Sequence, residues 1–457
     1  MSFRPWTRWR FSSERNPLQP GALAQEVDRL CADSRVHQLF EWFSRHEREI
    51  SDFQLAITSI PAPTFAEQAR AEWLREHLQT LGLEASIDAV GNLLAARPGL
   101  HADMRSGVRS EAPSIAISAH LDTVFPAATE LNIRREHARL LGPGISDNGS
   151  GLAAIWALAS AFHAAGIVTA LPLLFLANVG EEGDGNLHGM RHIYRERLGR
   201  GSAPPVKDGP APALALLIAL DGAGTDNVIS EALGSRRFEI VIEGPGGHSW
   251  SDFGTPNPIV AAAFLVDALS RIPLPANPRT TLNVGTIEGG TSVNAIPARV
   301  ILKIDLRSSD PGRLDDLEQR IRRAVADACA ETQSHSSHAR AQLRHHIAKV
   351  GERPTGELPS TSPLLAAIRA VDAQLGIQSQ LLRASTDANI PLSLGLEAVA
   401  LGAGGSGGGA HTIQEWFDPA GREQALKRIA LLILILAGLP PAVPPLPASS
   451  STPRESA

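Results

Sequence analysis

Two adjacent carboxylates follow an apolar segment that has the composition of a buried strand. Glu181 and Glu182 lie in the stretch ANVGEEGDG, and the segment LPLLFLAN leads into it. Adjacent like charges repel each other, and charged groups beside a core are costly to desolvate. A solvated loop would explain the pair, and so would a bound cation. If a cation binds there, the two glutamates have different roles.

Further acids and histidines stand beside other apolar segments. His120 and Asp122 follow SIAISA, and Asp221 follows PALALLIAL. Asp147 precedes a helix-like apolar segment, and His411 follows a glycine-rich loop. In sheets of parallel strands, ligands bind at the carboxyl ends of the strands. Because such positions recur along the chain, we predict that their side chains converge on one site.

The predicted site consists of imidazole and carboxylate groups without thiolates. This ligand set suits zinc, with cobalt and manganese as further candidates. Two divalent metal ions could share it, with His120, Glu182, Asp221 and His411 as terminal ligands and Asp147 as the bridge. A bridging carboxylate holds two cations about 3.5–4 Å apart, which is the spacing of two-metal hydrolases.

The elements that must position these residues alternate between short apolar strands and helices. This order is typical of a mainly parallel sheet with helices on both faces. Thr64 is expected to cap a helix at 65–81. Residues 233–349 instead follow the order strand-helix-strand-strand-helix-strand, which fits a small α+β sandwich. We therefore predict an α/β protein with a catalytic domain at 35–232 and 350–440, interrupted by an inserted lid.

Composition and the termini limit the possible functions. Residues 1–34 contain basic residues but no apolar segment of a secretory signal, so we expect a disordered extension. The Pro/Ser-rich residues 441–457 are also expected to be disordered. A net charge of −6 with scattered basic residues gives no footprint for nucleic acid. The most apolar run, IALLILILAGL, is too short to span a bilayer. We expect a cytoplasmic protein that binds neither nucleic acid nor membrane.

Taken together, the motifs resemble those of the M20-type metallopeptidases, the family of peptidase T, carboxypeptidase G2 and the acetylornithine and succinyl-diaminopimelate deacylases. The motifs extend over nearly the whole chain except the termini, and their combination is far more specific than any one alone. They are SAHLDTV (118–124), SDNGSG (146–151), GEEG (180–183), LDG (220–222), GGHS (246–249), SVNAIP (292–297), DLRS (305–308) and GAHT (409–412). The resemblance implies a zinc-exopeptidase-like catalytic domain with a lid that also dimerises.

The resemblance also implies how the metals are shared. His120 and Asp221 would bind one metal ion, and Glu182 and His411 would bind the other. Asp147 would bridge the two ions.

Other roles follow from the same resemblance. Asp122 would orient the imidazole of His120. Glu181 would be the general base that takes a proton from a metal-bridging water and passes it to the leaving amine. His248, in the lid, would donate to the oxyanion, often from the neighbouring subunit. Asn294 and Arg307 would hold the substrate, and Arg307 could grip a carboxylate with two hydrogen bonds.

The function implied is a di-zinc exopeptidase that hydrolyses short peptides and forms a homodimer through its lid. Asp221, where many deacylases have glutamate, and the segment PAPTFAEQARAEWL favour the aminopeptidase or tripeptidase members. An N-acyl-amino-acid deacylase that uses the same site is the alternative. A peptide-binding protein on an inactive hydrolase scaffold is disfavoured, because every expected ligand and the base are present.

Overall fold

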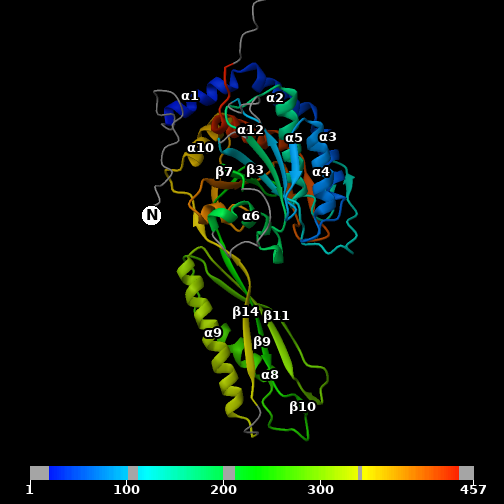
Figure 1. Ribbon diagram of the computed structural model, residues 1–457, viewed down its shortest axis with the longest axis vertical. Coiled ribbons are helices and arrows are strands. Elements are labelled where there is room, and N and C mark those ends of the chain that lie inside the picture. The colour runs from blue at the N-terminus through cyan, green and yellow to red at the C-terminus, as the bar shows by residue number, and fades with distance from the viewer. Residues whose placement is uncertain (1–19, 101–111, 199–210, 338–341, 442–457) are drawn as a thin grey trace, which may run out of the picture.

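The computed structural model describes residues 20–100, 112–198, 211–337 and 342–441. Its two parts are a layered domain with a large sheet and an elongated lid that extends away from one side of that domain (Figure 1). None of the helices in these described ranges combines the length and the hydrophobicity needed to cross a bilayer.

The large sheet has nine strands in the order β1-β2-β6-β3-β7-β17-β8-β15, with β16 also paired to β8. Its strands are β1 (Glu84–Ile87), β2 (Leu93–Arg97), β3 (Ser114–His120), β6 (Leu173–Asn178), β7 (Leu214–Leu220), β8 (Asn227–Ala232), β15 (Gly356–Glu357), β16 (Gln380–Ala384) and β17 (Ala398–Leu401). The central strands β6, β3, β7 and β17 pair in parallel, while β1, β2 and β15 pair antiparallel toward the edges. The predicted α/β fold with a mainly parallel central sheet is confirmed.

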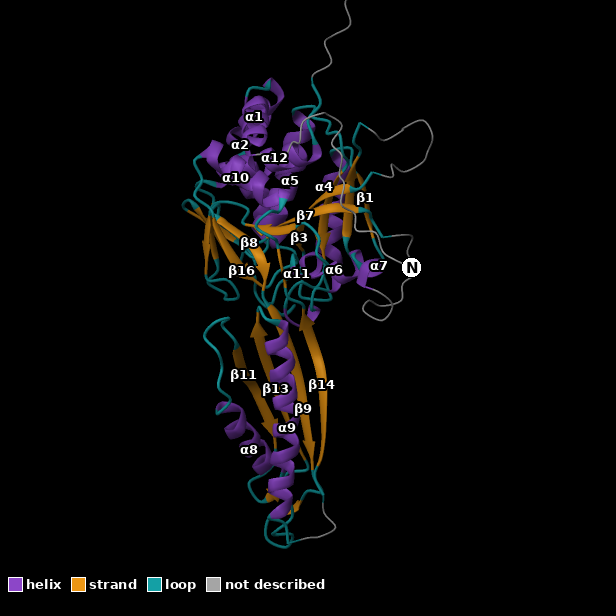
Figure 2. Ribbon diagram, turned by 90° about the vertical axis from the view of Figure 1, so that its left-hand side faces the viewer, coloured by secondary structure: helices purple, strands orange, loops and turns teal. Residues whose placement is uncertain are grey.

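Apolar helices cover one face of this sheet. They include α5 (Gly149–Ala164), which packs on β3, β6 and β7, and α12 (Arg422–Ala437), which packs on β3. Behind them lie α2 (Ser34–Arg45), α3 (Glu47–Thr58) and α10 (Pro363–Leu375), while α4 (Gln68–Thr80) covers β1 and β2. The opposite side faces the lid and carries α6 (His188–Ile193), α7 (Arg195–Leu198), α11 (Asn389–Ser393) and several strand-end loops (Figure 2).

The first described helix contradicts the predicted disordered extension. Helix α1 (Pro20–Cys31) buries Leu23, Val27 and Leu30 and packs on α10 and α12. Three apolar residues spaced by four and three positions form one face of a helix, and that face finds an apolar partner here. The prediction is therefore wrong for residues 20–34. Its remainder, and the predicted disordered tail beyond residue 441, lie outside the described residues.

The lid is an antiparallel sheet with two helices on one face. Its strands β9 (Gly234–Glu243), β11 (Thr281–Gly289), β13 (Arg299–Ser308) and β14 (Arg344–Arg353) are arranged in the order β11-β13-β9-β14, and its helices are α8 (Pro258–Ser270) and α9 (Pro311–Ser334). Alternate strand residues face the helices and form the core of the lid. The predicted α+β sandwich is thus present. Strand β14, however, extends to Arg353, beyond the predicted limit of the lid at residue 349.

Two smaller sheets complete the fold. The pair β10 (Gly247–His248) and β12 (Ala295–Ile296) lies toward the tip of the lid, far from the large sheet (Figure 1). The other sheet joins β4 (Arg134–Glu136) and β5 (Arg139–Leu141) to β18 (Ser406–Gly408) and β19 (Trp416–Asp418). This second sheet brings the glycine-rich loop beside the segment that contains Asp147.

The packing of α1 gives a first prediction. Leu30 is fully buried, and truncating a buried leucine to alanine costs about 2–5 kcal/mol. We expect Leu30→Ala to lower the free energy of unfolding by that amount in a denaturant titration. Gln25→Ala, on the exposed face of the same helix, is the matched control and should have little effect. Equal stability of the two variants would mean that α1 does not contribute to the core.

Candidate active site

Five predicted ligands lie together at the carboxyl ends of three neighbouring strands. His120 is the last residue of β3, Glu182 lies in the turn after β6, and Asp221 follows β7. Asp147 comes from the loop before α5, and His411 from the loop between β18 and β19. Because β6, β3 and β7 are adjacent and parallel, their carboxyl ends meet at one edge, as the sequence analysis assumed.

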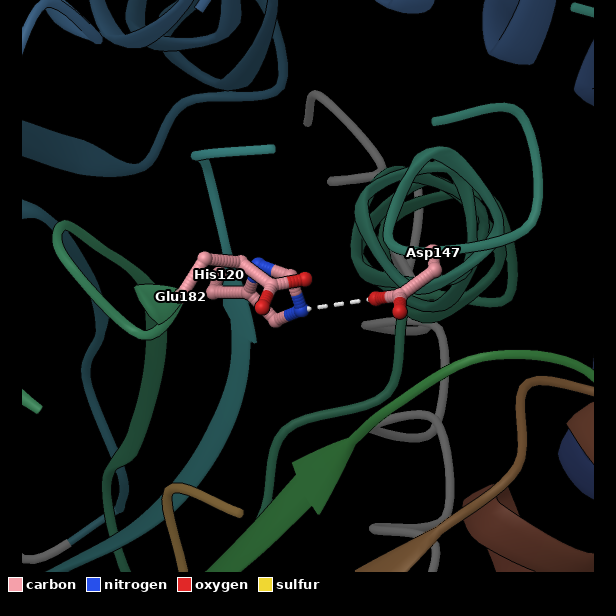
Figure 3. A group of neighbouring side chains, drawn as sticks. All are labelled: His120, Asp147 and Glu182. Carbon is pink, nitrogen blue, oxygen red and sulfur yellow. Dashed lines mark hydrogen bonds and ion pairs between the residues drawn. The ribbon is translucent and has the colours of Figure 1, made fainter. Parts of the chain in front are cut away.

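Asp147 lies between the two histidines. Its Oδ1 atom is 3.0 Å from Nε2 of His120, and its Oδ2 atom is 3.2 Å from Nε2 of His411. His411 is also 3.0 Å from Oε1 of Glu182, and His120 is 3.8 Å from Oδ1 of Asp221. Figure 3 shows the carboxylate of Asp147 directed at the imidazole of His120. The two oxygens of one carboxylate therefore face two different imidazole-carboxylate pairs.

The donor set fits divalent metal ions. Ligand atoms of His120, Asp147 and Glu182 all lie within 4.8 Å of one another. The pKa of His411 is raised to about 9, chiefly by its hydrogen bond with Asp147. Burial lowers the pKa of His120, but hydrogen bonds with nearby carboxylates outweigh it and raise this pKa well above its ordinary value. The carboxylates thus favour positive charge where cations would bind.

Asp122 holds both the first histidine and the glutamate turn. Its carboxylate is fully buried and lies 3.5 Å from Nδ1 of His120. Its two oxygens accept hydrogen bonds from the backbone N–H groups of Glu181, at 3.0 Å, and Glu182, at 2.9 Å. Thr64 donates its hydroxyl to the same carboxylate at 2.9 Å. The prediction that Thr64 caps a helix is wrong, because the chain first turns and α4 begins at Gln68.

Asn148 connects the loop of Asp147 to the turn of Asp221. Its side-chain oxygen caps α5 by accepting from the backbone N–H of Gly151 at 3.1 Å, and its amide donates to the carbonyl of Leu220 at 2.9 Å. A Cβ atom on Gly151 would lie 2.3 Å from the asparagine oxygen, so only glycine fits there. The short motif SDNGSG therefore contains both a predicted ligand and the residue that anchors the loop of that ligand.

Glu415 also belongs to the site, although its role was not predicted from the sequence. It is almost fully buried, and its carboxylate accepts hydrogen bonds from the backbone N–H groups of Gly144, Ser146 and Asp147, each at 2.8 Å. Burial raises the pKa of Glu415 to about 7 although these bonds oppose the shift. It follows His411 closely in the stretch AHTIQE, so it ties together the loops of two predicted ligands. Its position in that stretch was the one available signal.

Helix α4 and Glu67, the residue directly before it, support the strand ends of the site. Glu67 accepts a hydrogen bond at 3.0 Å from the backbone N–H of Gly180, directly before the two glutamates. Arg70 is buried and donates at 2.7 Å to the carbonyl of Leu121, between His120 and Asp122. Burial lowers the pKa of Arg70 to about 10, against the raising effect of nearby acids. Both side chains therefore anchor strand-end backbone.

A cavity of about 180 Å³ opens beside the ligand cluster. Its lining is Asp147, Glu181, Glu182, Gly183, Asp221, Ser235, Arg237, Arg307, Arg353, Ser385 and His411. One wall is thus acidic, and the other contains three arginines that come from the lid strands. Asp305 joins two of these arginines, at 3.3 Å from Nε of Arg237 and 2.8 Å from Nε of Arg307.

Glu181 faces this cavity and contacts the arginine wall. Its Oε1 atom is 2.9 Å from Nη1 of Arg353, and both side chains are buried. Burial raises the pKa of Glu181 well above its ordinary value, although the Arg353 guanidinium opposes the rise. Arg237 and Arg353 were not anticipated, because neither lies in a recognisable motif.

Two predicted residues are not brought to this site within one chain. His248 and Asn294 are exposed and belong to the region where β10 pairs with β12, toward the tip of the lid (Figure 1). Neither lines the cavity, whereas Arg307 does. The backbone N–H of Ser249 donates to the carbonyl of Asn294 at 3.0 Å, so the two loops at this end of the lid are held together.

Known proteins resemble this chain in both of its parts. Residues 231–333, most of the lid, match the peptidase dimerisation domain, and residues 101–238 match peptidase family M28. A probable carboxypeptidase of Uncinocarpus reesii is 27% identical over 365 residues, which cover 72% of this chain and 74% of the relative. A probable carboxypeptidase of Aspergillus clavatus is 32% identical over 279 residues, and there the chain spans only 56% of the relative's length.

Solved structures share the whole architecture. Aminopeptidase PepT of Bacillus cereus has a TM-score of 0.65 and 18% identity, with 86% of this chain and 99% of that chain covered. A Bacillus subtilis protein described as a dinuclear metal binding peptidase from the M20 family has a TM-score of 0.58 and 17% identity, with coverage of 86% and 99%. The chain therefore resembles the M20-type metallopeptidases, through a lid that matches a peptidase dimerisation domain and through a fold shared with M20 structures. The identities to these structures are low, so the similarity concerns the fold, and the roles of the individual site residues stay predictions.

The contacts of Glu415 lead to a prediction about metal binding. We expect Glu415→Gln to weaken divalent metal binding by about 10–100-fold, the usual effect of losing a group that orients a ligand. A glutamine has one acceptor oxygen and would turn its NH₂ group toward backbone N–H groups. Affinity for zinc would be measured by competition with a chromogenic chelator.

Glu397→Gln is the matched control for this measurement. Glu397 also accepts a backbone hydrogen bond, from Leu364 at 3.3 Å, but it lies outside the cavity and the ligand cluster. Its replacement should leave zinc affinity unchanged. The role assigned to Glu415 is wrong if both variants bind zinc as the natural chain does.

Proposed function

We propose that this protein is a metal-dependent exopeptidase that hydrolyses short peptides at an amide bond next to a free carboxylate. One observation carries the proposal: a single small cavity is lined by four of the five predicted ligands, by the buried Glu181 and by three arginines. The arrangement combines a place for cations, a group that can move a proton and a place for an anion.

The metal ligands in this proposal are the five clustered residues. His120 and Asp221 hold one divalent cation, Glu182 and His411 hold the other, and Asp147 bridges, in agreement with the distances between these side chains. Zinc is favoured, and cobalt or manganese would suit the same donors. Bound cations at such a site lower the pKa of a water molecule and polarise the carbonyl of the scissile amide.

Glu181 is the general base. It removes a proton from the attacking water and transfers it to the leaving amine, a contribution of about 10²–10⁴-fold in rate. Its neighbour Glu182 is directed at His411 instead, so the two adjacent carboxylates have separate tasks. Asp122 supports both tasks because it fixes the backbone N–H groups of both glutamates.

The three arginines of the cavity indicate which end of a peptide substrate would bind there. In a cavity this small, a carboxylate bound by Arg307 lies close to the scissile amide. A carboxypeptidase or dipeptidase substrate has its terminal carboxylate at that position, and the two fungal relatives are named probable carboxypeptidases. The preference for aminopeptidase or tripeptidase activity, which rested on Asp221 and one short segment, stays a prediction. The cytoplasmic location also stays a prediction.

The same arginines are also compatible with the alternative function, an N-acyl-amino-acid deacylase. An N-acyl amino acid also presents a carboxylate that is separated from the amide nitrogen by one carbon atom, so Arg307 would bind it equally well. The two substrate classes differ on the acyl side, where a peptide has a free or extended amine. A functional assay must therefore vary the acyl half while the carboxylate half stays constant.

Dimerisation would complete the site. The lid matches a peptidase dimerisation domain, and His248 lies toward its far end, away from its own cavity. In a homodimer that pairs through the lids, His248 of the partner subunit would reach the cavity and donate to the oxyanion. Asn294 belongs to the same region and would accompany it.

A panel of hydrolysis assays tests whether the enzyme recognises the free C-terminal carboxylate of its substrate. The zinc-loaded protein would be incubated with free-amine dipeptides and tripeptides, their C-terminal amides, their N-acetylated forms and N-acetyl amino acids, with products identified by mass spectrometry. We expect cleavage of peptides that have a free carboxylate and little cleavage of the amides. Hydrolysis of N-acetyl amino acids alone would instead establish the deacylase, and efficient cleavage of the amides would contradict the role of the arginine wall.

The assignment of the base is tested separately. We expect Glu181→Gln to lower kcat by about 10²–10⁴-fold while the protein retains its metal content, because the amide cannot accept the proton. Metal content would be measured by elemental mass spectrometry and kcat with the best substrate of the panel. Glu318→Gln, on the lid helix α9, is a control that should keep full activity. Near-normal turnover of Glu181→Gln would show that another group is the base.

A further inference from the structure

The lid and the predicted base meet at one residue, Arg353. It is the last residue of lid strand β14, yet its side chain lies among residues of the catalytic domain. Nη1 donates to Oε1 of Glu181 at 2.9 Å, and Nη2 donates to the backbone carbonyl oxygen of the same glutamate. Nη1 also lies 3.2 Å from the hydroxyl oxygen of Ser385. One guanidinium therefore contacts both the carboxylate and the backbone of the residue that the mechanism needs as a base.

Neighbouring contacts strengthen this connection. The backbone N–H of Glu352 donates at 3.0 Å to the side-chain oxygen of Asn186, and Arg191 donates to the carbonyl oxygen of Glu352. From the adjacent lid strand β9, Arg237 donates to the carbonyl oxygen of Gly183. The turn that follows Glu181 is thus held at several points by the ends of two lid strands.

We propose that Arg353 is a positioning residue for Glu181, so that the lid places the general base. The proposal rests on the function proposed above, because Glu181 acts as a base only in that function. Arginine suits the task because its planar fork can hold two acceptors in a fixed relative geometry. The side chains of Arg353 and Glu181 are only 8% and 6% exposed, so water does not readily replace this contact.

The proposal separates Arg353 from the other two arginines of the cavity. Arg237 and Arg307 share the carboxylate of Asp305, within the lid itself. Among the described residues of the lid, Arg353 has no carboxylate partner of this kind, and its charge is directed at the catalytic domain. Loss of Arg353 would leave a carboxylate that is buried and free to rotate. A displacement of about 1 Å at a catalytic group can cost on the order of 10²-fold in rate.

A double-mutant cycle tests this role in the full-length, zinc-loaded protein. The variants are Arg353→Met, Arg353→Lys, Glu181→Gln and the combination of Glu181→Gln with Arg353→Met, each assayed for kcat, KM and metal content with the same peptide. We expect Arg353→Met to lower kcat on the order of 10²-fold, with KM and metal content unchanged. In the Glu181→Gln background the same change should alter kcat by less than about twofold, because residues that act through one contact are not additive.

Arg353→Lys is a conservative variant that is less prone to misfold, because lysine keeps the positive charge and the aliphatic stem but lacks the planar guanidinium. It should retain an intermediate kcat. Arg236→Met is the matched control: Arg236 is also a lid arginine in ion pairs, with Asp315, Glu318 and Glu352, and lies outside the cavity lining. It should leave kcat unchanged.

The other outcomes overturn the proposal in distinguishable ways. A raised KM with normal kcat in Arg353→Met would make Arg353 a substrate-binding residue. Equal losses in the natural and Glu181→Gln backgrounds, or loss of metal, would make its role structural. An active natural protein whose Arg353→Met variant is fully active would refute this role alone. A natural protein that binds zinc but hydrolyses nothing in the panel would refute the proposed function, and the role of Arg353 with it.

Discussion

The carboxylate of Asp147 faces His120 with one oxygen and His411 with the other, at 3.0 and 3.2 Å. These three residues come from three distant segments, so their meeting depends on the sheet order and on backbone that is held in place. Buried polar groups are costly unless they are hydrogen-bonded. Here the buried carboxylates of Asp122 and Glu415 satisfy that requirement by accepting backbone N–H groups of the very loops that carry the site.

The site therefore has two kinds of acids. Those directed into the cavity are available to cations and protons, and those directed into the backbone hold the first kind in position. Glu182 and Glu181 belong to the first kind, while Asp122, Glu67 and Glu415 belong to the second. Loss of a polar group that supports a ligand in this way typically costs about 10–100-fold in metal affinity or activity. Replacing such a supporting residue is expected to reduce metal affinity or activity more than it affects the fold.

The lid contributes more than a cover. The ends of the lid strands supply the arginines of the cavity, and Arg353, the last residue of β14, contacts the carboxylate of Glu181. An anion-binding wall opposite a cation-binding cluster would orient an amide whose carboxylate lies nearby, which peptides and N-acyl amino acids both satisfy. The same strand ends hold the turn after the glutamates, so an altered lid position would also move the base.

Residue types and local spacing were enough to predict which side chains gather at the site. His120, Glu182 and Asp221 lie at or after the ends of apolar strands, and the carboxyl ends of parallel strands lie at one edge of a sheet, where the order β6-β3-β7 makes these three ends neighbours. Only the tertiary structure revealed Arg353 and Glu415. Each contacts residues far away in the chain, Glu181 and the loop of Asp147, and an arginine or glutamate of this kind is indistinguishable in the sequence from one on the surface. Their roles come from long-range packing and burial, which no local pattern encodes.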